Sequence, residues 1–305
     1  MSGRCLLCGA ASNGLLALGD QPISSHYLAG RADRAPERPL TLGRCPSCGT
    51  IQLLPPFPNE SLTPPYSWIT YREPEDHLDH LVDAVAALPG LSRDSRIAGV
   101  SFKDQSTLDR FGRKGFEVRW CLDARADLGA AHPYANIESV PSLLTEERAR
   151  AIVAQRGPAD VVFARHVLEH AAEPSRLLAA LAALLREGGY LVLEVPDNEK
   201  NIVRQDYTMI WEEHALYFTA ESFSGVLAGM PLSPVLTATY PYRFEDVLVT
   251  VARKQTAPAT RQANSAVRDD AAIRGYAEAF PEWSRRYRAA IGEASGGKLA
   301  ALYGA

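Results

Sequence analysis

The sequence predicts an α/β protein built from a small metal-binding module, a doubly wound parallel sheet and a C-terminal helical extension. The sheet is indicated by two short apolar runs, 160–164 and 190–195, which are typical of strands buried on both faces. A helix joins the two runs. It starts at Pro174, carries leucines along one face and is expected to end at Gly188-Gly189. Strand, helix and strand in this span form a βαβ unit, whose strands are parallel.

The composition is that of an ordinary globular protein. Of the 305 residues, 46% are hydrophobic and 22% are charged, and the net charge is −4. The chain has no basic stripe with interleaved aromatic residues, no apolar run of membrane-spanning length and no signal-peptide core at its N-terminus. We therefore expect a cytoplasmic protein that acts on a small molecule and has no nucleic-acid or membrane partner.

Four of the five cysteines form two pairs, Cys5-x-x-Cys8-Gly and Cys45-x-x-Cys48-Gly. Each pair turns two thiolates toward one tetrahedral ion, and the glycine relieves the tight backbone behind the turn. Four sulfur ligands leave no open coordination position, so the predicted zinc is structural. It is expected to supply folding energy to a module of residues 1–65. The alternative is four unrelated buried cysteines.

Two further segments complete the predicted organisation. Residues 66–254 are assigned to the sheet domain, and residues 255–305 to a linker, a helix and the start of a further domain. Additional strands are expected at 96–100, 115–123 and 247–251, and helices from Pro74, over 146–155 and over 271–291.

The functional site is expected at the carboxyl edge of the sheet, because ligands of open parallel sheets bind beyond the strand ends. Asp123 ends the second predicted strand, where an acid commonly holds the ribose hydroxyls of a nucleoside. The alternative for Asp123 is a helix cap or a solvated carboxylate. Ser101 and Asp104 lie in the turn after the first strand and are expected near the other end of a cofactor. Arg165, at the end of the strand 160–164, is counted with them as a cofactor-binding residue.

A cluster of ionisable side chains follows the last parallel strand. Glu213 and His214 are predicted to form a general-base pair in which the carboxylate orients or charges the imidazole. The alternative is an exposed helical face. His170 follows the strand 160–164 and is expected to reach the same cleft. Tyr66 either lines that cleft or pins the metal-binding module to the next domain.

Several motifs together resemble those of sugar C-methyltransferases, which act on nucleotide-linked deoxy-4-ketosugars in sugar and antibiotic biosynthesis. The resemblance covers about residues 1–253 and is specific in sum. It rests on the two cysteine pairs, on Leu18-Gly-Asp-Gln-Pro-Ile, on Ala164-Arg-His-Val-Leu-Glu-His170, on Leu193-Glu-Val-Pro-Asp197 and on Trp211-Glu-Glu-His214 through Tyr217-Phe218. The last segment is similar to a family signature usually written Tyr-His-Glu-His followed by Tyr-Phe.

The resemblance implies a mechanism and a set of site residues. A base removes the proton next to the sugar ketone, and the enolate attacks the methyl group of S-adenosylmethionine (SAM). On the matching positions, His214 with Glu213 is the base pair, and His170 and Tyr66 contact the sugar and its developing oxyanion. The N-terminal zinc is structural in this family, and a Rossmann-like third domain normally follows.

The chain departs from the family pattern at two motifs. The family's cofactor turn is close to Gly-Ser-Asn-Asp-Gly, whereas this turn is Ser101-Phe-Lys-Asp-Gln-Ser106 and has no glycine. Trp211 and Glu212 replace the first two residues of the signature. Two alternatives therefore stand beside the SAM-dependent C-methyltransferase. One is an enzyme of the same fold that performs proton transfer without SAM, and the other is a catalytically silent scaffold.

Overall fold

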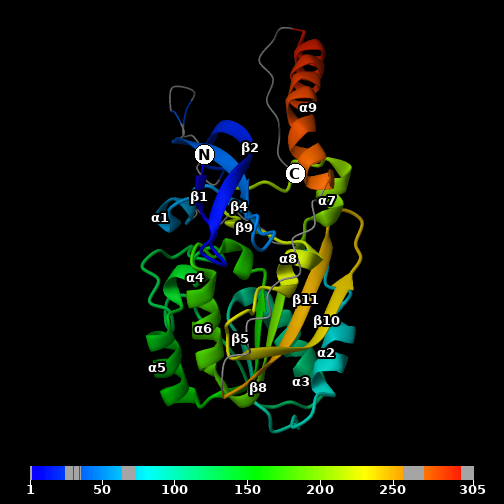
Figure 1. Ribbon diagram of the computed structural model, residues 1–305. Coiled ribbons are helices and arrows are strands. Elements are labelled where there is room, and N and C mark those ends of the chain that lie inside the picture. Colours follow the sequence, from blue (N-terminus) through cyan, green and yellow to red (C-terminus); the bar gives the residue numbers. More distant parts are fainter. Residues whose placement is uncertain are drawn as a thin grey trace.

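The computed structural model describes residues 2–24, 30, 34, 36–63, 73–256 and 271–296. Tyr66, the linker at 257–270 and the expected start of a further domain at 298–305 lie outside these residues. The described chain forms a six-stranded mixed sheet with helices on both faces and a five-stranded antiparallel sheet (Figure 1).

The six-stranded sheet is the larger part of the predicted α/β fold. Its order is β10-β11-β8-β7-β5-β6. The strands β6, β5, β7 and β8 are parallel, and β11 and β10 run antiparallel to them. The bounds are β5 Ile97–Gly99, β6 Arg119–Cys121, β7 Ala159–Arg165, β8 Leu185–Asp197, β10 Leu232–Tyr240 and β11 Asp246–Lys254. Each expected strand is present, and the parallel strands end at one common edge.

The predicted βαβ unit is confirmed as β7, helix α6 (Pro174–Leu184) and β8. The helix starts at Pro174 as expected but ends at Leu184, before the two glycines. The difference arises because Leu185 already pairs with Ala159 of β7. Gly188 then allows a turn inside the strand segment, with a φ of 73° that favours glycine.

Helices cover both faces of this sheet (Figure 1). On one face lie α2 (Leu78–Ala86) and the 3-10 turn η1 (Phe102–Asp104), which continues into α3 (Gln105–Arg113). On the other face lie α4 (Val140–Leu143), α5 (Glu146–Arg156) and α6. The helix expected from Pro74 begins at Leu78, and the helix expected over 146–155 is confirmed.

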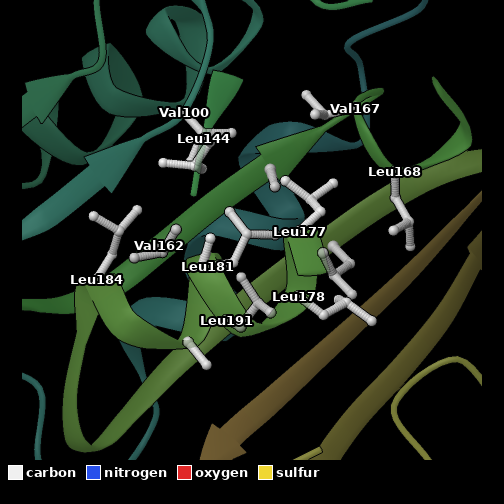
Figure 2. Close-up of a cluster of buried hydrophobic side chains, with 14 of the residues drawn as sticks. Val100, Leu144, Val162, Val167, Leu168, Leu177, Leu178, Leu181, Leu184 and Leu191 are labelled. Carbon is white, nitrogen blue, oxygen red and sulfur yellow. The ribbon is translucent and has the colours of Figure 1, made fainter. Parts of the chain in front are cut away.

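Alternation along β7 divides the hydrophobic core between the two faces. Val161 and Phe163 pack with the residues of α2 and α3, whereas Val162 and Ala164 pack with those of α6. Figure 2 shows the α6 side, where Leu181 lies near Val162 and is fully buried. Because both faces are covered, the charged side chains of β7 and β8 lie near the strand ends, apart from Glu194, which is buried inside β8.

The five-stranded sheet has the order β1-β2-β3-β4-β9. Its bounds are β1 Ser2–Arg4, β2 Ala11–Pro22, β3 Glu37–Arg44, β4 Ile51–Leu53 and β9 Leu216–Tyr217, and α1 (Asn59–Leu62) follows β4. The fifth strand, β9, is distant from the other four in the sequence, since its Tyr217 pairs with Ile51 of β4. The N-terminal sheet therefore includes a strand from the segment that carries His214.

The C-terminal helix α9 (Ala271–Ser295) lies beside the N-terminal sheet and α7 (Glu199–Arg204) (Figure 1). Its buried residues Ile273 and Tyr276 join the apolar core of that sheet. Tyr276 also stacks on Tyr207 at 4.4 Å between ring centroids. A short helix α8 (Ala220–Ser224) follows β9. Within the described ranges, no helix is both long enough and apolar enough to cross a membrane.

Candidate catalytic, cofactor and metal sites

The four paired cysteines meet at the ends of β1 and β3. The Sγ atoms of Cys5 and Cys48 lie 3.5 Å apart, as do those of Cys8 and Cys45, and all four sulfurs lie within 4.8 Å of one another. In a tetrahedral zinc site with bonds near 2.3 Å, the sulfurs are about 3.8 Å apart. A contact with Cys5 lowers the pKa of Cys48 to about 4. The donor set fits a structural zinc ion with no open position.

The turn after β5 is held from inside by Asp104. This side chain is fully buried, and its Oδ2 accepts hydrogen bonds from the backbone of Val100 (2.8 Å) and Ser101 (3.1 Å). Burial raises the pKa of Asp104 to about 7 against the opposing effect of Arg165. A Cβ at Gly99 would lie 2.5 Å from the Asp104 Cβ. Gly99 thus makes room for Asp104, which supports the turn instead of offering its carboxylate to a ligand.

Ser101 also serves the turn. Its hydroxyl accepts the backbone N–H of Lys103 at 3.3 Å, and the side chain is buried. Phe102 is half exposed, whereas Lys103 is buried and pairs with Glu73. Neither Ser101 nor Asp104 therefore has the exposed position that a cofactor ligand at the methionine end requires.

Asp123 was expected as the last residue of the strand 115–123, but it lies two residues beyond the end of β6 and is exposed. Its Oδ1 accepts the backbone N–H groups of Arg125 (2.9 Å) and Ala126 (2.7 Å), and these bonds lower the pKa of the carboxyl group. The residues that follow form a turn and not a helix, so Asp123 stabilises a turn instead of capping a helix. Hydrogen bonding through one oxygen leaves the carboxylate ionised and suited to accept ribose hydroxyls.

Arg165 is the largest fully buried side chain. Its Nε donates to Glu194 Oε1 at 2.9 Å, its Nη1 donates to the carbonyl of Lys103 at 2.6 Å, and its backbone N–H bonds Asp104 at 3.2 Å. The Nη2 atom is buried and has no hydrogen-bond partner among the residues that the structure describes. An unpaired guanidinium N–H at the carboxyl edge is a donor that the carboxylate of a bound methionine moiety would satisfy.

His166 follows β7 in a left-handed conformation, with a φ of 52° that costs free energy for a residue other than glycine. Its Nδ1 lies 3.3 Å from Glu169 Oε1 and its Nε2 lies 3.2 Å from Glu194 Oε1. Burial alone would lower the pKa of His166, but the two carboxylates raise it to about 9. The imidazole is therefore a cation between two buried anions.

Arg165, His166, Glu169, Glu194 and His77 form an ionic cluster at the ends of β7 and β8. The sequence analysis did not identify Glu194 or His77 as members. Glu194 is fully buried inside β8, and its Oε2 lies 3.0 Å from Nε2 of His77, which also contacts the Tyr242 hydroxyl at 2.8 Å. His77 directly precedes α2 and is only 5% exposed. An acid inside an apolar strand needs a cation, and the spacing of His77 and Leu81 would have placed His77 on the buried face of α2.

The structure brings His170 and His214 together at the carboxyl edge. Their ring centroids are 4.9 Å apart and the rings are nearly perpendicular, at 82°. His170 lies in the 3-10 turn η2 (Leu168–His170), and its Nδ1 donates to the backbone carbonyl of Glu213 at 2.9 Å. Burial lowers the pKa of His170, and burial with the neighbouring His170 lowers the pKa of His214 to about 3. Both imidazoles are neutral.

Two expectations about the segment before β9 are corrected. Glu212 and Glu213 are buried in a turn, so the exposed helical face is wrong. Glu213 does not raise the pKa of His214, because burial dominates at both residues and raises the pKa of Glu213 itself to about 8. The contact between Glu213 and the histidines runs through its backbone carbonyl. Glu212 accepts two hydrogen bonds from Ser24, at 2.5 and 2.7 Å, and so ties this turn to the N-terminal segment.

Comparison with known proteins defines the class of protein to which this chain belongs. The family model described as "Methyltransferase domain" matches residues 66–230, which is just over half of the chain. The chain therefore belongs to the methyltransferase domain family, and the predicted enzyme class, a SAM-dependent methyltransferase, is confirmed.

Similarity to individual proteins is lower. The C-methyltransferase NovU of Streptomyces niveus is 24% identical over 224 residues, which cover 72% of this chain and 53% of NovU. The chain thus spans about half the length of this curated relative. Among solved structures, the 1,6-didemethyltoxoflavin-N1-methyltransferase of Burkholderia thailandensis is 15% identical, with 59% of this chain and 79% of that chain covered at a TM-score of 0.41. The magnesium protoporphyrin IX methyltransferase of Synechocystis is also 15% identical, with 58% and 81% covered at a TM-score of 0.38.

Proposed function

We propose that this methyltransferase acts on a carbon atom next to a ketone, in a nucleotide-linked sugar or a similar keto compound. The observation that carries the proposal is the pair of neutral imidazoles, His170 and His214, at the carboxyl edge of the sheet. A neutral imidazole has a lone pair that accepts a proton. The similarity to the C-methyltransferase NovU supports carbon as the methyl acceptor.

In the proposed reaction, a ring nitrogen of His214 takes the proton from the carbon next to the carbonyl. The imidazolium that forms is stabilised by Glu169, whose pKa His166 lowers against the effect of burial, so that its carboxylate is ionised. His170 Nδ1 donates a hydrogen bond to the Glu213 carbonyl, and this bond is proposed to hold the ring beside the enolate oxygen. Tyr66 is proposed to contact the substrate, as the sequence motif implies.

Asp123 is proposed to hold the ribose of SAM, and Arg165 to hold the carboxylate of its methionine moiety. When bound, SAM supplies the electrophilic methyl group and leaves as S-adenosylhomocysteine. Residues 1–65 are proposed to form a zinc module whose ion, on Cys5, Cys8, Cys45 and Cys48, is structural. Residues 66–254 are proposed to be the catalytic domain.

The test is isotope exchange at the carbon next to the carbonyl of a nucleotide-linked 4-keto sugar, followed by NMR in deuterium oxide. The His214→Ala variant is expected to lose exchange by on the order of 100-fold or more, the usual contribution of a general base, while zinc content and folding stay unchanged. His132→Ala, which alters an exposed histidine, is the matched control. Unchanged exchange in His214→Ala would remove His214 from the reaction.

A second candidate function is proton transfer without SAM. It is favoured by the turn after β5, where Asp104 fills the space above Gly99 and Lys103 is buried. Calorimetry with SAM and S-adenosylhomocysteine separates the two. If SAM is used, Asp123→Ala weakens binding by about 1–3 kcal/mol, the cost of losing hydrogen bonds to a charged group. Asp94→Ala, an exposed acid elsewhere, has no effect. Proton exchange without detectable binding of either compound supports the second function.

A further inference from the structure

A second cluster of metal-ligating side chains lies at the carboxyl edge of the six-stranded sheet. One ligand atom from each of Glu169, His170 and His214 lies within 4.8 Å of the others. Glu169 and His170 are neighbours in η2, and His214 arrives from the turn before β9. His214 is 44 residues from His170 in the sequence, so two distant segments converge on one point.

The ligand atoms of this cluster are available. The Oε2 atom of Glu169 is buried and has no hydrogen-bond partner within the described ranges, and the contact with His166 is made by Oε1. His170 donates from Nδ1, so in the neutral ring its Nε2 carries a lone pair. Neither ring nitrogen of His214 is hydrogen-bonded to another residue in the described part of the chain. A buried carboxylate oxygen without a partner is costly, and an ion between these atoms would remove that cost.

We propose that Glu169, His170 and His214 form a second metal site, which binds a divalent transition ion such as Zn²⁺ or Fe²⁺. Two imidazoles and one carboxylate are the donor set of catalytic zinc sites and of non-haem iron(II) sites, both of which keep open positions. In a tetrahedral site the ligand atoms are about 3.4 Å apart, so small side-chain movements close the set. The bond from His170 Nδ1 to a backbone carbonyl is the outer contact that usually orients a histidine ligand.

The site differs from the cysteine cluster in ligand chemistry and in its consequence for the reaction. Imidazole and carboxylate suit Zn²⁺ and Fe²⁺ with open positions, whereas four thiolates close the coordination sphere. A ring nitrogen of His214 that binds the ion no longer accepts a proton. Ion binding therefore competes with proton abstraction, and this part of the inference rests on the proposed function.

The experiment uses the full chain loaded with one zinc per chain and then titrated with Zn²⁺ or Co²⁺. A second ion is expected to bind, and bound Co²⁺ is expected to show the weak visible bands of nitrogen and oxygen ligands without thiolate charge transfer. His170→Ala, His214→Ala and the isosteric Glu169→Gln are each expected to weaken the second ion by more than about tenfold, and the first ion stays bound. His132→Ala is the control and keeps both ions.

Proton exchange is measured along the same titration and is expected to fall as the second ion binds. The metal site is overturned if the chain binds only one ion throughout the titration. It is also overturned if none of the three ligand variants changes the affinity for the second ion. The competition is overturned if exchange continues undiminished on a chain with both ions bound. If exchange is absent before any ion is added, the proposed function fails, and the metal titration still decides the site.

Discussion

The cysteine cluster and the ionic cluster at the ends of β7 and β8 satisfy their charges in opposite ways. The four sulfurs face one another, with no cation among the residues that make up the cluster. At the sheet edge, Arg165 and His166 lie between Glu194 and Glu169, so that the charges of the chain compensate one another. We expect the first cluster to depend on an ion from solution, whereas in the second, among the described residues, Arg165 Nη2 and Glu169 Oε2 are buried without a hydrogen-bond partner. Buried charge alone therefore does not indicate a ligand, but an unpaired ligand atom does.

The largest effect is expected at the cysteine cluster. Cys5→Ser removes one of four zinc ligands, and metal binding in such modules contributes on the order of 10 kcal/mol to folding. We expect loss of zinc and of amide protection in β1 to β4, measured by elemental analysis and hydrogen exchange. Because β9 pairs with β4, the turn that carries His214 should lose protection as well.

Cys121→Ser is the matched control, since Cys121 lies at the end of β6 and contacts the Ser101 carbonyl. It should retain the zinc. Full protection of β1 to β4 in a zinc-free Cys5→Ser protein would contradict the dependence on an ion.

A smaller effect is expected from Glu194→Gln, which leaves the Arg165 cation buried without its main partner. Breaking one side of a buried ion pair costs about 3–5 kcal/mol, measured as the free energy of unfolding in denaturant. Glu187→Gln is the control, because its pair with Lys254 is exposed and contributes less than about 1 kcal/mol. If both variants lose the same free energy of unfolding, Glu194 does not compensate the buried charge of Arg165.

The smallest effect is a pH dependence at His166. Its pKa rises from the ordinary 6.5 to about 9 in the folded chain, so the folded state holds the proton more tightly. This stabilisation is complete below pH 6.5 and is lost as the pH rises to 9, with a change on the order of 1–3 kcal/mol. The free energy of unfolding, measured between pH 6 and 9.5, should fall in this window and should be flatter in His166→Gln. An equal slope in both proteins would exclude His166 as the source.

Sequence patterns predicted what depends on local spacing. The two Cys-x-x-Cys turns and the apolar βαβ unit are each determined by residues close together in the sequence. The structure contains the cysteine cluster and the βαβ unit. The adjacency of His170 and His214 was also expected, because both follow strands that end at the same edge. The enzyme class was predicted from motifs and not from spacing alone.

The rest depends on contacts between distant residues. His77 and Glu194 are 117 residues apart, and Ser24 and Glu212 are 188 apart. β9 has only two residues, too few for a periodic signal. Its partner β4 is in the same sheet but comes from the N-terminal part of the chain. The depressed pKa of His214 was missed for the same reason, since burial outweighs the adjacent carboxylate and depends on the whole fold.

The close approach of Gly99 and Asp104 restricts which residues can stand at position 99, beside the turn after β5. Any side chain at position 99 would place its Cβ 2.5 Å from that of Asp104, so Gly99 cannot be replaced without moving Asp104. Replacing Gly99 alone would displace Asp104 and with it the hydrogen bonds to Val100 and Ser101. Every residue other than glycine brings this Cβ, so position 99 accepts only glycine while Asp104 stays in its present place.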